Sequence, residues 1–182
     1  YCTVCGIIDG TALDNDKDDA KADLDEIAQD AKDEIDGSDL PDDVKDDLKD
    51  KVDEIINGRG EVEGSTDFDD VDQTVENAKD EIEDAILNAE KDDAKSDLDK
   101  IAQSAKDEIG SSGISDEEKA ELKDKVDAAI EDAKEAIDNA TSKEEIENIV
   151  NDTREDIDDL LKGSLDNELA EKKDAAISDL TE

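Results

Sequence analysis

The chain of 182 residues contains a long internal duplication. The segment Lys17–Ile35 matches Lys91–Ile109 at 16 of 19 positions, with an offset of 74 residues. The match continues more loosely to Val52 and its counterpart Val126, and after a one-residue slip it resumes at an offset of 75. Two copies of one sequence are expected to form two copies of one structure, so the duplication predicts two tandem units of about 75 residues each.

Each unit contains three stretches in which apolar residues recur every three or four positions. This spacing places them on one stripe of a helix, and no stretch alternates with the period of two that is typical of a strand. In the first unit the stripes are Ala20, Leu24, Ile27, Ala28, Ala31 and Ile35; Val44, Leu48, Val52, Ile55 and Ile56; and Val71, Val75, Ala78, Ile82 and Ile86. In the second they are Ala94, Leu98, Ile101, Ala102, Ala105 and Ile109; Leu122, Val126, Ala129, Ile130, Ala133 and Ile137; and Ile146, Val150, Thr153, Ile157 and Leu161. The predicted fold class is all-α, with tandem three-helix-bundle repeats.

Helix boundaries are visible in the sequence. Ser115-x-x-Glu118 and Ser142-x-x-Glu145 have the capping-box pattern, in which each side chain satisfies a free backbone N–H at a helix start. Pro41 stands where a helix begins, and its missing N–H costs nothing there.

Glycines predict where the helices end. Gly37 and Gly110 follow the first helices, where a left-handed residue often stops a helix. The second helix of the first unit is expected to end near Asn57, because three glycines follow it, and residues 58–66 are predicted to form a loop. Its counterpart in the second unit is expected to run on toward Asp138.

The two units lack a linker of their own. No Gly or Pro occurs between Asp67 and Ile109, so the third helix of the first unit is expected to run straight into the first helix of the second, forming an elongated rod. We divide the chain into a non-helical segment (1–16), repeat 1 (17–90), repeat 2 (91–163) and a last helix (164–182). That last helix either caps the stack or opens a further repeat.

The charge balance limits the possible functions. The chain has 62 acidic and 21 basic residues, a net charge of −41 and no His, Met or Trp. Nucleic-acid binding requires clusters of Lys and Arg, so it is not expected. Catalysis is not expected either, because the usual neutral-pH acid and base is missing. No apolar run approaches the ~18 residues of a membrane span, and the absence of a signal peptide together with a first residue Tyr1 suggests a piece of a longer protein.

The repeat unit resembles a known family. Its most characteristic residues are the segments 124–130 (DKVDAAI) and 136–141 (AIDNAT). The unit is similar to three-helix repeats of unknown function in giant cell-wall-anchored surface proteins of Gram-positive bacteria, and to the related FIVAR modules. The resemblance implies an extracellular stalk at the cell surface, sometimes with adhesive roles. This chain is far more acidic than those repeats. Its first unit also lacks the sequence AIDNATS, which joins the second and third helical stretches of the second unit at residues 136–142.

Leu169–Ile177 resembles the opening helix of albumin-binding GA modules, although the remainder of such a module is absent. This likeness implies an albumin-like protein as a possible partner of the last helix.

Cys2 and Cys5 form a CxxCG motif and are the only cysteines. The motif resembles one knuckle of rubredoxin, but a metal site needs four ligands, so a metal would have to bridge two chains. A redox CxxC opens a helix beside a βαβ unit, and no such unit is predicted. The remaining readings are a Cys2–Cys5 disulfide, a disulfide between chains, or free thiols. We expect no cofactor, no metal site and no catalytic residue.

Several charged patterns also have simpler explanations. Asp14, Asp16, Asp18 and Asp25 fit positions 1, 3, 5 and 12 of a calcium loop, but the glycine of position 6 is missing, and the stretch equally reads as a first helical turn. Paired acids such as those at 158 and 159 could imitate a glycosidase dyad, although no aromatic platform accompanies them. We expect the lysines to form i,i+4 pairs on a solvated face; these lysines are Lys45, Lys49, Lys51, Lys119, Lys123 and Lys125.

The leading functional hypothesis is a structural spacer or stalk repeat of an extracellular surface protein, or a subunit of an extracellular fibre. The alternative is a protein-binding helical module, adhesin-like or albumin-binding-like, that recognises a host or matrix protein. Binding would require exposed apolar residues outside the core stripes, and the candidates are Leu40, Val62, Phe68, Leu87 and Ile149. A disordered polyanion is a third reading. Possible partners are other copies, associated end to end or into a fibre, and nonspecific cations.

The charge of −41 makes a first prediction about stability. Salt screens repulsion between exposed carboxylates, because the Debye length falls from about 30 Å at about 0.01 M to about 3 Å at about 1 M. We expect Tm, followed by circular dichroism, to rise over this range; a gain of about 1 kcal/mol per unit would raise it by about 4–8 °C. A flat response would refute the role assigned to self-repulsion.

Overall fold

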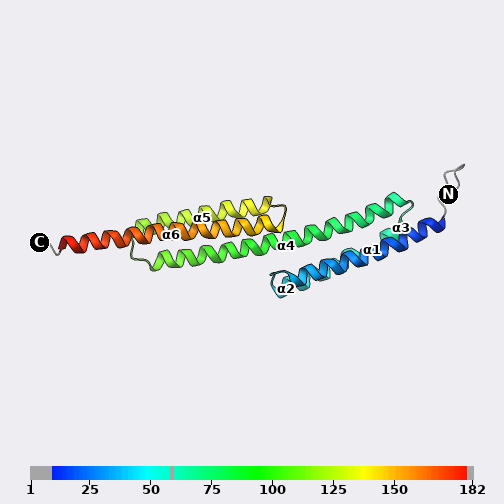
Figure 1. Ribbon diagram of the computed structural model, residues 1–182, viewed down its shortest axis with the longest axis horizontal. Coiled ribbons are helices and arrows are strands. Elements are labelled where there is room, and N and C mark those ends of the chain that lie inside the picture. The colour runs from blue at the N-terminus through cyan, green and yellow to red at the C-terminus, as the bar shows by residue number, and fades with distance from the viewer. Residues whose placement is uncertain (1–9, 58–59, 180–182) are drawn as a thin grey trace. The chain divides into compact units, whose positions relative to one another are not determined.

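All secondary structure in the described part of the chain is helical. The computed structural model describes residues 10–57 and 60–179, with side chains described over 11–57 and 62–163. The helices are α1 (Gly10–Gly37), α2 (Asp42–Asn57), α3 (Gly60–Gly64), α4 (Phe68–Ser111), α5 (Asp116–Asn139) and α6 (Lys143–Asp179) (Figure 1). Contacts divide the chain into two compact units, Tyr1–Ala89 and Glu90–Glu182. The predicted all-α class, built from helical repeats, is confirmed.

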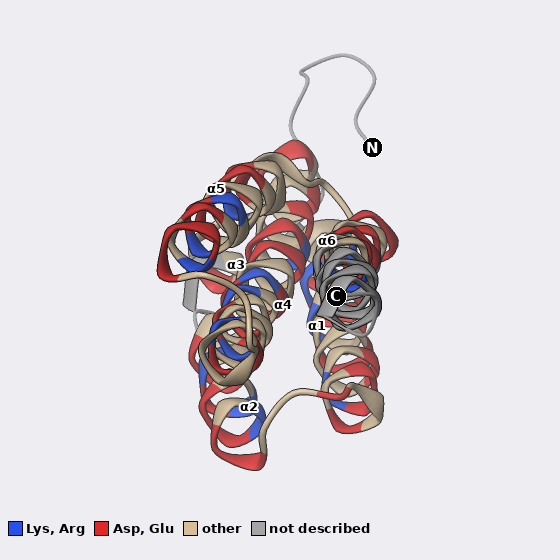
Figure 2. Ribbon diagram, turned by 90° about the vertical axis from the view of Figure 1, so that its left-hand side faces the viewer, with Lys and Arg blue, Asp and Glu red and all other residues tan. Residues whose placement is uncertain are grey.

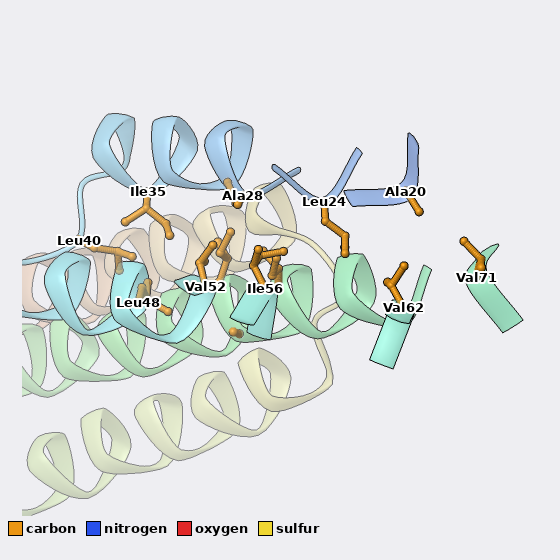
Figure 3. Close-up of a cluster of buried hydrophobic side chains, with 14 residues drawn as sticks. Ala20, Leu24, Ala28, Ile35, Leu40, Leu48, Val52, Ile56, Val62 and Val71 are labelled. Carbon is orange, nitrogen blue, oxygen red and sulfur yellow. The ribbon is translucent and has the colours of Figure 1, made fainter. Parts of the chain in front are cut away.

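The first unit packs α1 against α2, α3 and the N-terminal half of α4. The apolar faces of these helices close on one another to form a narrow core (Figure 3). The buried residues are Ala20, Leu24, Ala28, Ala31, Ile35, Leu40, Leu48, Val52, Ile56, Val62, Val71, Ile82, Ala85 and Ile86. Partly buried residues at the edge of this core are Leu13, Ile27, Val44, Ile55, Val75, Ala78 and Ala89. The predicted stripes therefore face the core.

The second unit repeats this arrangement with the C-terminal half of α4, α5 and the first part of α6. Its buried apolar residues are Ala94, Leu98, Ala102, Ala105, Ile109, Leu122, Val126, Ile130, Ala133, Ile137, Ala140, Ile146, Ile157 and Leu161. Many are alanines, which allow helices to approach closely but bury little area each. Acidic residues line the helices of both units, with fewer basic residues between them (Figure 2).

One helix belongs to both units. α4 runs from Phe68 to Ser111 without a break, so it supplies the third helix of the first unit and the first helix of the second. Its 44 residues correspond to a length of about 66 Å. The expectation that no linker separates the units at this point is confirmed.

The second helix differs between the units. α5 is continuous and ends at Asn139, whereas its counterpart is divided into α2, which ends at Asn57, and the short α3. Val62 in α3 is fully buried and takes the place of Ile137, which is fully buried in α5. The prediction of a loop over residues 58–66 was therefore wrong in part. The tertiary position of Val62 favours a helical turn even though glycines surround it.

Glycines end fewer helices than predicted. Gly37 is the last residue of α1, and Gly110 lies inside α4. No glycine among those whose surroundings the structure describes has the left-handed backbone, so the predicted left-handed caps at these two positions were wrong. α6 likewise continues through Gly163, where a new helix was expected to begin. An exposed glycine costs a helix only about 1 kcal/mol, and the flanking helical residues outweigh that cost.

Helix starts are capped by side chains. The Ser115 hydroxyl accepts from the Glu118 backbone N–H, and the Glu118 carboxylate accepts from the Ser115 backbone N–H at 3.0 Å. This capping box was predicted, and its hydrogen bonds from Ser115 lower the pKa of Glu118.

The third helices share a different cap. Ser142 Oγ accepts from the Glu145 backbone N–H as expected, but the Glu145 carboxylate accepts from the Thr141 backbone N–H at 2.9 Å instead of closing the box on Ser142. In the first unit, Asp67 accepts from the Asp70 backbone N–H, and the Asp70 carboxylate accepts from Thr66. Both units therefore start this helix in the same way.

Candidate functional site

Two lysines of α1 bind the end of the second helix in the first unit. Lys17 Nζ donates to the Glu63 carbonyl oxygen at 2.9 Å, and Lys21 pairs with the Glu63 carboxylate. The hydrogen bond to Glu63 is the main cause that raises the pKa of Lys21. Cations at this position also interact favourably with the negative, C-terminal end of the helix dipole.

The second unit has the same arrangement one repeat later. Lys91 Nζ donates to the Asp138 carbonyl oxygen at 3.0 Å, and Lys95 pairs with the Asp138 carboxylate. These lysines belong to the KDDAK sequence that both units share. Their recurrence indicates that the shared sequence selects the packing of the first helix on the second.

Further ion pairs cross the same interface. Lys32 pairs with Asp53 at 2.5 Å, and Lys106 pairs with Asp127 in the equivalent position. Each pair joins the first helix to the second within its own unit. Lysine residues thus lie where the acidic surfaces of the two helices come together.

The predicted i,i+4 pairing of lysines is replaced by contacts between elements for two of the six lysines. Lys49 pairs with Asp36 of α1, and Lys45 donates to the Asp36 carbonyl oxygen at 3.3 Å. Helix spacing alone identifies neighbours along one helix and misses Asp36, which lies 9 and 13 residues before these two lysines on a different helix.

One contact between the third helix and the first differs between the two units. In the second unit, Lys143 pairs with Glu90 at 2.7 Å, and the Glu90 side chain is only 11% exposed. The equivalent positions of the first unit are Phe68 and Asp16. One oxygen of Asp16, Oδ2, is buried without a hydrogen-bond partner among the described residues. The ion pair that closes the second unit is therefore absent from the corresponding place in the first.

A shallow groove lies between the first and third helices of each unit. In the first unit it has a volume of about 250 Å³. Its lining residues are Asp16, Asp19, Ala20, Asp23, Val71, Asp72, Val75, Glu76 and Lys79. In the second unit it has a volume of about 270 Å³ and lies further along the helices. There it is lined by Lys100, Ile101, Ser104, Ala105, Glu108, Arg154, Ile157, Asp158 and Leu161.

Two acids of α4 have contrasting surroundings. Burial raises the pKa of Asp93 above its usual value, and the nearby Asp97 carboxylate adds to the rise while Lys100 opposes it. Asp99, six residues further along the chain, instead pairs with Lys134 of α5 at 2.5 Å. Ionised Asp93 therefore costs stability, because a raised carboxyl pKa means that the folded chain binds the proton more tightly than the unfolded chain does.

The repeat family is identified by sequence comparison. The family model for a Domain of Unknown Function, DUF1542, matches residues 16–89 and 90–162. This chain belongs to the DUF1542 family. DUF1542 domains are repeats of Gram-positive surface proteins, which confirms the resemblance found in the sequence. Searches of curated proteins and of solved structures gave no match.

The structure places the sequence candidates as follows. The calcium pattern from Asp14 to Asp25 lies inside α1 of the first DUF1542 repeat, so it forms a helix and no loop. Among the side chains that the structure describes, over residues 11–57 and 62–163, no three of His, Cys, Asp or Glu gather as metal ligands would. Asp158 and Asp159 are exposed on α6. Cys2 and Cys5 lie outside the described residues, and their pairing stays a prediction.

The apolar residues proposed for partner binding are buried or half-buried within the DUF1542 units. Leu40 and Val62 are buried in the first core, so their predicted exposure was wrong. Phe68, Leu87 and Ile149 are half-buried. In the part of the chain that the structure describes, no helix combines the length and apolar character needed to cross a membrane.

The pair between Lys143 and Glu90 gives a test of the charged contacts. Lys143→Met leaves the nearly buried Glu90 carboxylate without this partner, which should lower the free energy of unfolding of the second unit by about 1–2 kcal/mol. The matched control is Lys79→Met, which removes the exposed 3.7 Å pair with Glu83 and should change stability by less than about 0.5 kcal/mol. Urea denaturation followed by circular dichroism measures both. Equal losses would contradict the structure.

The surroundings of Asp93 give a pH-dependent test. Asp93→Asn removes a carboxylate whose ionisation opposes folding, so it should raise the free energy of unfolding at pH 7. The advantage should shrink as the pH falls through the raised pKa of Asp93, because the wild-type carboxyl is then protonated in the folded state. Asp99→Asn removes the pair with Lys134, so it should give no gain at pH 7. If the two variants gained equally, the effect would be one of net charge alone.

Proposed function

We propose that the chain is a spacer of an extracellular surface protein, in which successive three-helix units carry length and do no chemistry. The observation that carries the proposal is α4, a single helix that belongs to both units. A linker between domains allows independent motion, whereas a helix shared by two cores resists bending at the junction. Membership of a family of repeats in Gram-positive surface proteins supports a structural role at the cell surface.

The chemical character of the units supports the same proposal. The chain has no histidine, and the described residues offer shallow charged grooves in which no three metal ligands converge. The acidic groove beside Asp16 is suited to loose association with cations. A fibre of such chains, joined end to end, is a variant of the same structural role.

A protein-binding module, adhesin-like or albumin-binding-like, is the alternative. It predicts apolar side chains outside the cores, and the five candidates are buried or half-buried. A host or matrix protein recovered specifically by the immobilised chain would favour this alternative over the spacer.

Small-angle X-ray scattering tests the spacer. A compact domain of 182 residues has a radius of gyration of about 16 Å, and an unfolded chain of that length has about 45 Å. We expect a value well above the compact one, with the cross-section of a three-helix bundle and a fully helical circular dichroism spectrum. A value near about 16 Å would overturn the proposal.

A hinge variant provides the control for scattering. Glycine at both Asn88 and Ala89 weakens α4 at the boundary between the units, by about 1 kcal/mol at Ala89 and by less at Asn88, which is itself a poor helix former. The same double substitution at Glu135 and Ala136 lies within α5, away from the boundary, and serves as the matched control. Only the first should broaden the distribution of interatomic distances.

A further inference from the structure

The end of the sequence repeats the opening of both units. The eight residues Lys173–Leu180 read KDAAISDL, and six of them are identical to Lys91–Leu98, which read KDDAKSDL. The corresponding segment of the first unit, Lys17–Leu24, reads KDDAKADL. The family match ends at residue 162, before this third occurrence. We propose that the last part of α6 is the first helix of a third three-helix unit, and that its face binds a two-helix partner of the same kind as α5 with the start of α6.

The helical register agrees with this assignment. At the junction of the two units, Ala94 follows Ile86 by eight positions. Ile86 is the last core position of the third helix of the first unit, and Ala94 is the first core position of the second unit. Fifteen residues separate their counterparts Leu161 and Ala176. The two spacings differ by seven residues. Seven residues turn a helix by about 700°, which is only about 20° less than two full turns. A continuous helix therefore gives Ala176 nearly the same angular position relative to Leu161 as Ala94 has relative to Ile86.

α6 is long enough to extend beyond α5, the helix that precedes it in its own unit. α5 has 24 residues and α6 has 37, and only residues 140–142 connect them. At about 1.5 Å per residue, α6 extends about 20 Å further than α5. Figure 1 shows its C-terminal part continuing beyond α5 and the end of α4. α4 passes from one unit to the next in the same manner.

The two complete units define the chemistry of the missing partner. Ala176 and Leu180 occupy the positions of Ala94 and Leu98, which are buried in the second unit. Lys173 occupies the position of Lys91, whose Nζ binds the carbonyl oxygen of Asp138 near the end of the second helix. The partner is thus an acidic helical hairpin with an apolar stripe, whose second-helix C-terminus lies beside Lys173. This inference does not depend on the spacer role.

Hydrogen exchange tests the assignment. In the chain of 182 residues we expect the backbone amides of residues 164–180 to exchange much faster than those of 146–161, because a helical extension of this length is marginal without a packing partner. Appending a copy of residues 99–162 directly after Leu180 supplies the rest of a unit in the register of the repeat. Protection at 164–180 should then rise by about tenfold or more.

A shifted extension is the matched control. Two extra residues between Leu180 and the appended copy turn its stripe by about 200°, so protection should not rise. An in-register copy that leaves exchange at 164–180 unchanged overturns the assignment. Protection that grows with the concentration of the 182-residue chain also overturns it, because the partner would then be a second copy.

A substitution in the 182-residue chain gives a second measurement that needs no extension. If the assignment is right, Leu180→Asp should leave Tm of the two complete units unchanged, because Leu180 then contributes to the core of neither unit. If the helix caps the second unit instead, Leu180→Asp should destabilise that unit, as Leu98→Asp should, because Leu98 is fully buried there. A fall in Tm caused by Leu180→Asp therefore overturns the assignment.

Discussion

Burial of small aliphatic side chains along narrow seams is the interaction on which both units depend. Among the residues whose side chains the structure describes, no aromatic residue is buried in either core, and alanine supplies much of the contact between helices. Such seams gain little free energy per residue, since burial yields about 25 cal/mol per Å² of apolar surface. The cores must therefore be long, and they follow the helices over many turns from Ala20 to Ile35 and from Ala94 to Ile109.

Repulsion among 62 carboxylates works against these seams, and the position of the lysines limits it. Ion pairs cross from the first helix to the second at matching places in the two units, as with Lys32 and Lys106. Exposed pairs contribute little individually. At the joint between two acidic helices, however, each lysine also removes a repulsion that would otherwise act directly across the interface.

Sequence periodicity was sufficient to predict the helices and most of the core, because a stripe such as Leu24 to Ile35 can be buried in only one way. It failed where tertiary contacts decide. Val62 is surrounded by glycines that signal a loop, yet it fills the place of Ile137 and its segment is helical. The partner of Glu90 lies 53 residues away, and no local pattern identifies it. The unpartnered oxygen of Asp16 becomes visible only when the two units are compared in three dimensions.

The division of the second helix into α2 and α3 shows where such a chain can change length. The one-residue slip between the units falls between Ile56 and Val62, inside the only helix of the three that is not carried over into a neighbouring unit. One residue gained or lost turns everything downstream in a continuous helix by about 100°. In α4 that turn would misdirect an entire following core. Insertions and deletions in these repeats should accordingly accumulate in the second helix. Any that occur in a helix shared by two units should have a length that is a multiple of seven residues.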